Sequence, residues 1–151
     1  MTRDRRLLAA GLLLSVLLAL SGLRPYERGT WLMEVAPILV AGPVLVATYR
    51  RFPLTTLLYA LLFCHALILM VGGIFTYARV PLGFWVQDLF HLGRNPYDKL
   101  GHFAQGLVPA LLAREIVLRT GAVSGKLYAL IGAVVSMPAL ARLHDRAMAR
   151  L

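Results

Sequence analysis

Residues 95–106 place acid and base groups at a spacing that lets them meet. Asp98 and His102 are four positions apart, so a helix would put both on one face, where the carboxylate can pair with the imidazole. Gln105 falls in the same narrow sector of such a helix. A carboxylate that holds an imidazole is the start of an acid–base unit, which makes Asp98 and His102 a candidate catalytic, proton-handling pair. The alternative is structural, because Asp98 could instead stabilise the positive end of its helix.

Further polar residues are expected on the same side of the membrane as this pair. Glu34 lies near the outer end of the apolar segment 32–48, the second in the chain. Tyr77 and Arg79 follow the outer end of the third apolar segment, 54–76. We interpret Glu34 as an assisting carboxylate, although a carboxylate that only reaches water at the interface is the alternative. Arg79 and Arg94 could bind phosphate oxygens, with Tyr77 and Gln105 completing a ligand site. Ordinary solvated loop charge is the alternative for each arginine.

Polar residues inside the apolar segments have simpler explanations. His65, in the middle of the third segment, is either functional or a neutral imidazole that hydrogen-bonds a neighbouring helix. Arg114 and Glu115 lie near the inner end of the fourth segment, where long side chains can reach the interface. Gly101 and Gly106 indicate close helix packing, with room for a headgroup as the alternative. No phosphate-loop, dinucleotide-binding, zinc-protease or serine-hydrolase motif occurs, so the sequence predicts no metal site and names no cofactor.

The segments that must position these residues are strongly apolar. The chain has 151 residues, of which 59% are hydrophobic and only 15% charged, whereas soluble domains have about 45–50% and about 25%. Five long apolar runs, close to the roughly 17–25 residues that cross a bilayer as a helix, lie at 7–23, 32–48, 54–76, 100–118 and 127–143. The sequence therefore predicts one polytopic domain over residues 1–151, an all-α integral membrane bundle of about five transmembrane helices.

The one sizeable loop, residues 77–99, is rich in aromatic side chains. Pro81 suits the first position of a helix, so we expect a short amphipathic helix that lies in the outer interface. The residues expected to anchor the loop and to form an outer aromatic belt are Phe84, Trp85, Phe90, Tyr26, Trp31 and Tyr77.

The net charge of +9 reflects short basic clusters between the apolar runs. That distribution argues against a nucleic-acid partner and favours the bilayer, including anionic lipid, as the partner. The basic residues of the first loops favour a cytoplasmic N-terminus, whereas those of the tail fit an even number of spans better than five. A cleaved signal peptide is the alternative for the first run. The single cysteine, Cys64, excludes an intrachain disulfide and a cysteine-based zinc site.

Three runs, at residues 31–37, 77–88 and 95–106, resemble the YjdF-type bacterial inner-membrane proteins. These form a family of multi-pass proteins of unknown function, distantly VanZ-like through the pattern at residues 98–103.

This resemblance implies an inner (plasma) membrane location and carries no known reaction. It marks Glu34, Asp98 and His102 as positions of family motifs. The family pattern also implies six spans, and it implies that an acidic block before the C-terminal tail is missing here, so the chain could be an inactive truncated member.

Three functions remain open from the sequence. The first is a multi-pass inner-membrane protein that binds a polar or phosphorylated lipid headgroup at its periplasmic face. The second is a membrane enzyme acting on a lipid or isoprenoid phosphate, with His102 as acid and base. The third is a non-catalytic assembly subunit, in which the polar face meets a second copy of the chain or another membrane protein.

Overall fold

The computed structural model describes residues 2–121, and this part of the chain is helical throughout its regular structure. The elements in chain order are α1 (Arg3–Ser21), α2 (Arg28–Thr48), α3 (Thr56–Phe75), the 3-10 helix η1 (Tyr77–Arg79), α4 (Pro81–Leu89) and α5 (Tyr97–Thr120). No strand occurs among these residues, so the predicted all-α class is confirmed for the described range. The fifth predicted span, 127–143, lies outside it.

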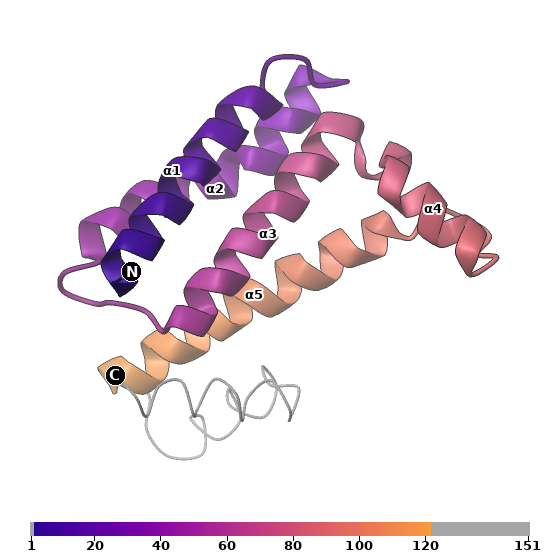
Figure 1. Cartoon of the computed structure of the whole chain (residues 1–151). Helices are drawn as coiled ribbons and strands as arrows, with labels where there is room; N and C mark the ends of the chain where they lie inside the picture. Colours follow the sequence, from indigo (N-terminus) through magenta and orange to yellow (C-terminus); the bar gives the residue numbers. More distant parts are fainter. Residues whose placement is uncertain (1, 122–151) are drawn as a thin grey trace.

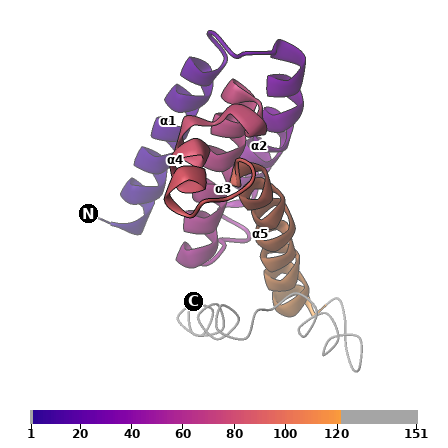
Figure 2. The ribbon, with the colours of Figure 1, turned by 90° about the vertical axis from the view of Figure 1, so that its right-hand side faces the viewer.

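The four long helices alternate in direction, and α3 lies at the centre (Figure 1). Helix α3 packs against α1, α2 and α5, and η1 joins it to the short helix α4. Helix α4 lies beside the end of α3 and the start of α5 in Figure 1, and in front of α3 in the turned view of Figure 2. We call this end of the bundle, which carries Glu34, Tyr77 and Asp98, the open end. The opposite end, which carries Thr55 and Glu115, is called the closed end.

The predicted boundaries agree with the observed helices to within a few residues. Helix α4 begins at Pro81 as the sequence indicates, because proline suits the first helical position. Among the described helices, α2 and α3 are long and apolar enough to cross a membrane by length and composition. Both α1 and α5 are of comparable length but carry charged residues at their ends.

The outward faces of α1 and α2 are apolar. Leu12 is 69% exposed, and Val46 at the end of α2 is 79% exposed. Helix α2 also tolerates Pro37 and Pro43 in its interior. Apolar outward faces and internal prolines are both typical of helices in lipid, where there is no water for an apolar surface to avoid.

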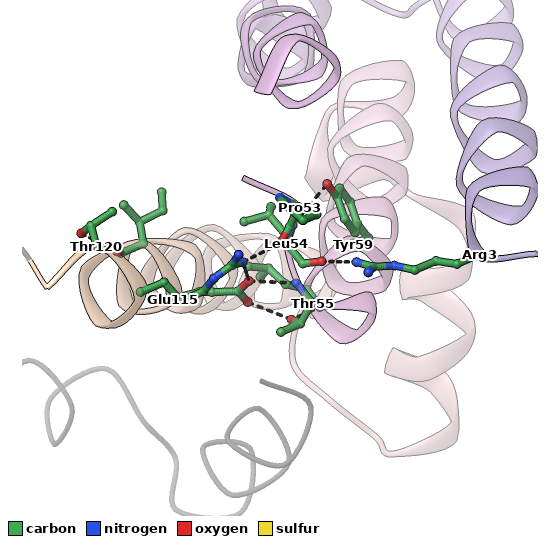
Figure 3. Close-up of polar contacts among 10 residues, drawn as sticks. Arg3, Pro53, Leu54, Thr55, Tyr59, Glu115 and Thr120 are labelled. Carbon is green, nitrogen blue, oxygen red and sulfur yellow. Dashed lines mark hydrogen bonds and ion pairs between the residues drawn. The ribbon is translucent and has the colours of Figure 1, made fainter. Parts of the chain in front are cut away.

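A polar network at the closed end fastens the start of α3 to α5. Glu115 is fully buried and points from α5 toward Thr55, as Figure 3 shows. The backbone N–H and the hydroxyl of Thr55 each donate to one Glu115 carboxylate oxygen, both at 2.8 Å. Arg119 donates to Glu115 Oε1 at 3.0 Å and also to the carbonyl of Pro53, while its guanidinium lies 4.1 Å from the ring centroid of Phe52.

This network corrects the sequence-based explanation of Arg114 and Glu115. We expected both side chains to extend to the interface, but Arg114 is 8% exposed and Glu115 is 0% exposed. For Glu115 the expectation was wrong because α5 packs along α3, which brings the carboxylate to Thr55 at the start of α3. A buried carboxylate is tolerated there because hydrogen bonds and a cation compensate for its lost hydration.

Candidate functional site

Three of the predicted site residues, from three different elements, meet at the open end. The Tyr77 hydroxyl of η1 donates to Glu34 Oε2 of α2 at 2.7 Å. The Gln105 side-chain amide of α5 donates to the same oxygen at 3.5 Å. Two donors therefore hold the carboxylate of Glu34 in place, although the hydrogen bond from Gln105 is long and exposed. We call these three residues the Glu34 cluster.

The Tyr77 ring is seated against glycines of two helices. A Cβ atom built on Gly101 would lie 2.2 Å from Tyr77 Cε1, and one on Gly72 would lie 2.6 Å from Tyr77 Cζ. The ring of Tyr97 is also close, at 5.9 Å between centroids. The predicted packing role of Gly101 is confirmed, whereas a Cβ on Gly106 would meet nothing within 4 Å.

This seat makes the expected aromatic-belt role of Tyr77 wrong. The chain turns back after α3, so the ring packs toward α3 and α5 and is only partly exposed. Burial raises the pKa of Tyr77, and the hydrogen bond to Glu34 raises it further. Tyr77 is therefore a neutral donor at ordinary pH, and it lies in η1, just beyond the end of α3.

Asp98 and His102 form a close pair on the first turns of α5. The distance from His102 Nε2 to Asp98 Oδ1 is 3.4 Å. The His102 side chain is 75% exposed and the Asp98 side chain is 46% exposed. The expected proximity of these two residues is therefore present, and both remain accessible. The catalytic role assigned to them stays a prediction.

The structural alternative for Asp98 agrees with its position, because Asp98 lies in the first turn of α5, near the positive end of the helix. Asn95 makes a further contact at this end. The Asn95 side-chain oxygen accepts a hydrogen bond from the Tyr97 backbone N–H at 3.0 Å. Helix α5 begins at Tyr97, three residues before the predicted apolar run 100–118.

Asn95 also has a positioning role that the sequence reasoning missed. It is 8% exposed, and its amide donates to the carbonyls of Val80 at 3.0 Å and Ala78 at 3.3 Å. A Cβ atom on Gly83 of α4 would lie 1.8 Å from Asn95 Oδ1, so only glycine allows this approach. Asn95 thus fastens the η1–α4 segment to the start of α5. The glycine inside α4 was a signal of this contact in the sequence.

The two candidate phosphate-binding arginines have different surroundings. The Arg79 guanidinium lies 4.1 Å from the centroid of the Tyr26 ring, a cation–π contact. Arg94 is exposed and lines an open hollow of about 360 Å³. The other residues of that hollow are Ala78, Phe84, Gln87, Asn95 and Asp98. Arg94 therefore remains available to a ligand, whereas Arg79 is already engaged by an aromatic ring.

His65 is buried in the middle of α3 at 8% exposure. Its Nε2 atom has no hydrogen-bond partner among the described residues, so the hydrogen bond expected to a neighbouring helix is not found there. Within residues 2–121, no group of three or more histidine, cysteine or acidic side chains is arranged to hold a metal ion.

The comparisons with known proteins place this arrangement in a family. A family model described as "Predicted membrane protein (DUF2238)" matches residues 6–146. The chain belongs to this family. It is 56% identical over 117 residues to the inner membrane protein YjdF of Escherichia coli (strain K12), a match that covers 78% of this chain and 56% of the relative.

This DUF2238 protein therefore spans about half the length of the curated relative that it matches. No solved structure matches it. The resemblance to YjdF-type proteins drawn from residues 31–37, 77–88 and 95–106 is confirmed, and the membrane character of the family agrees with the apolar outward faces of α1 and α2. The VanZ-like comparison remains a prediction.

Proposed function

We propose that this DUF2238 protein is a multi-pass inner-membrane protein whose open end binds a polar or phosphorylated lipid headgroup. The observation that carries the proposal is the gathering of accessible polar groups from α2, η1 and α5 at one end of a bundle whose outward faces on α1 and α2 are apolar. Ionisable groups kept at the membrane boundary, accessible and incompletely paired, are typical of a binding site.

The alternating helix directions support four spans within residues 2–121, with the open end on the periplasmic side, and the fifth proposed span, 127–143, lies outside the described residues. Helices α2 and α3 are long and apolar enough to cross the membrane. Helices α1 and α5 pack along α3 over comparable lengths, so they would cross with it. Basic residues at the closed end, Arg3, Arg5, Arg6, Arg50 and Arg51, favour a cytoplasmic position for that end and for the N-terminus.

Each group at the open end has a proposed task. Arg94 would bind phosphate oxygens through a two-pronged contact. The Asp98–His102 pair would exchange a proton with a bound ligand, and the Glu34 cluster would hold the neighbouring wall in shape.

A second candidate is a membrane enzyme acting on a lipid or isoprenoid phosphate. The observation that favours it is the accessible 3.4 Å pair of Asp98 and His102, which is the geometry that an acid–base residue and its orienting carboxylate need. Loss of turnover in His102→Ala, in a variant that still inserts and folds, would select this candidate over simple binding.

Lipid retention tests the binding proposal directly. The full-length chain would be purified in detergent, and its bound phospholipid would be measured as phosphorus per polypeptide. We expect retention well above that of a detergent-matched control membrane protein, and a several-fold loss in Arg94→Gln. The matched control is Arg50→Gln, an exposed arginine beyond α2 at the other end. Equal retention in the two variants, or none in the unaltered protein, would contradict headgroup binding at the open end.

The side assigned to each end is tested by labelling in intact cells. With Cys64 replaced by serine, single cysteines at Phe90 and at Arg50 would be exposed to a membrane-impermeant maleimide. Labelling at position 90 alone is expected, and labelling at position 50 alone would reverse the orientation.

A further inference from the structure

We infer that the hollow between α4 and the start of α5 accepts a phosphate ester that carries a primary ammonium group, the headgroup chemistry of an aminophospholipid. This inference rests on the proposed function and names the class of ligand for it. The evidence is that this hollow is lined by an arginine without a carboxylate partner among the described residues and by two acceptor side chains, Gln87 and Asp98.

Arg94 supplies the cationic part of the hollow. Its side chain is exposed, and no carboxylate among the described residues lies within ion-pairing distance of it. A guanidinium with no carboxylate partner presents its planar fork to solution, where it matches two oxygens of a phosphate.

Gln87 and Asp98 supply acceptors that a phosphate alone would not use. Gln87 lines the hollow, but its Oε1 is buried and has no hydrogen-bond partner among the described residues, so the side-chain amide must turn to bring this oxygen to a ligand. An unsatisfied buried acceptor is costly, so a donor at this position would be stabilising. The Asp98 carboxylate lines the same hollow, is 46% exposed and has His102 as its described partner at 3.4 Å. Two acceptors call for a ligand with several N–H donors and a positive charge.

A primary ammonium joined to a phosphate by a short linker meets both requirements. The phosphate would face Arg94, and the ammonium would donate to Gln87 and Asp98. A purely anionic headgroup such as glycerol phosphate has hydroxyl donors for Gln87, but it brings no positive charge to the Asp98 carboxylate. A trimethylated ammonium has the charge but no N–H group, so it would leave the Gln87 acceptor unsatisfied.

The surroundings of the hollow favour a lipid as the source of this chemistry. Helix α4 exposes Leu82, Trp85 and Leu89 at 57%, 74% and 73%, which suits a helix that lies in the membrane interface. On the same two segments is a second, almost wholly apolar hollow, whose lining residues are Leu82, Gly83, Val86, Pro96, Tyr97 and Leu100. Gly83 lines the apolar hollow and Asn95 lines the polar one, and the close approach of these two residues makes the hollows neighbours. A headgroup in the polar hollow would thus have apolar surface beside it for its chains.

Headgroup selectivity tests the inference without any substitution. The delipidated full-length protein in detergent would be titrated with phosphatidylethanolamine, phosphatidylcholine and phosphatidylglycerol that share the same acyl chains, and binding would be read by native mass spectrometry. We expect the ethanolamine lipid to bind about tenfold or more tightly than the other two. Equal binding of the ethanolamine and glycerol lipids overturns the inference but leaves headgroup binding intact. Binding of none of the three overturns both.

Variants then locate the selectivity. Asp98→Asn and Gln87→Met are expected to reduce ethanolamine-lipid affinity to the level of the glycerol lipid, whereas Arg94→Gln should weaken all three lipids. Asp88→Asn is the matched control, because Asp88 is an exposed carboxylate of α4 outside the hollow. Selectivity that survives Asp98→Asn and Gln87→Met together, in protein whose melting temperature is unchanged, overturns the assignment to this hollow.

A soluble arm distinguishes a membrane lipid from a free ester. Glycerophosphoethanolamine would be added in excess to the complex with the ethanolamine lipid. Displacement of the lipid would support the inferred headgroup chemistry and would show that the soluble ester is a sufficient ligand. Failure to displace supports a ligand whose acyl chains contribute to binding.

Discussion

The two ends of the bundle use the same kinds of side chain in opposite environments. At the closed end, Glu115 is fully buried, and both of its oxygens accept short hydrogen bonds from Thr55. At the open end, the Glu34 carboxylate accepts one short and one long hydrogen bond and is only partly buried. The Glu115 carboxylate is thus enclosed by neighbouring residues, whereas the Glu34 carboxylate is left partly accessible.

This difference separates structural from functional polar groups. A buried carboxylate with every oxygen occupied has no capacity for a ligand, so its contribution is to stability. Asp98 and Arg94 are accessible and charged, and Gln87 has an acceptor without a partner among the described residues. Charge within an apolar chain is therefore not in itself a sign of function, and its degree of internal pairing is the better guide.

The largest expected effect comes from removing the closed-end carboxylate. Glu115→Ala would leave the Thr55 N–H and the Arg119 guanidinium without their described carboxylate in a buried site, a loss of about 3–5 kcal/mol in unfolding free energy. Glu34→Ala, at the partly exposed open end, is expected to cost only about 1 kcal/mol. Thermal unfolding of both variants in detergent, followed by size-exclusion recovery, compares the two. Equal losses would show that the ends do not differ in this way.

The helical frame was predictable because long apolar runs indicate spans whatever their neighbours are. Helix α4 could be placed because Pro81 fixes its start, and the approach of Asp98 and His102 follows from helical geometry alone. These features depend on residues close together in the sequence, and such features are the ones that a single sequence specifies.

Contacts between distant segments could not be predicted in the same way. Whether Glu115 reaches solvent or a partner depends on how α5 packs on α3, and Thr55 is 60 positions away in sequence. The same holds for Tyr77, whose ring direction depends on the turn that follows α3 and on Gly72 and Gly101. No spacing in the sequence indicates either contact.

A smaller effect is expected where the Tyr77 ring is seated. Gly101→Ala would put a methyl group into the ring, so Tyr77 must move, at a cost of about 1–3 kcal/mol. Gly106→Ala is a matched control on the same helix, because its Cβ meets open space and alanine favours the helix over glycine by about 1 kcal/mol. The gain in helix propensity is common to both variants, so Gly101→Ala should have the lower melting temperature of the two. A loss of equal size in both would mean that the ring is not tightly seated.

The smallest effect is expected from Tyr77→Phe, which keeps the ring and removes only the hydroxyl that donates to Glu34. A single hydrogen bond to a charged group contributes roughly 1.5 kcal/mol, and less where water can replace the donor, as at the open end.

Burial and Glu34 raise the pKa of Tyr77 above its ordinary value of 10.0, so the folded state holds this proton more tightly than the unfolded state. Its contribution to stability is complete below pH 10 and declines as pH rises further, because only the unfolded chain then gains by releasing the proton. Melting temperatures of wild type and variant between pH 8 and pH 11 test this, since the variant should lose less stability over the alkaline range. Parallel curves would mean that the Tyr77 hydroxyl faces solvent rather than Glu34, and the open end would then lack the fixed wall on which its difference from the closed end depends.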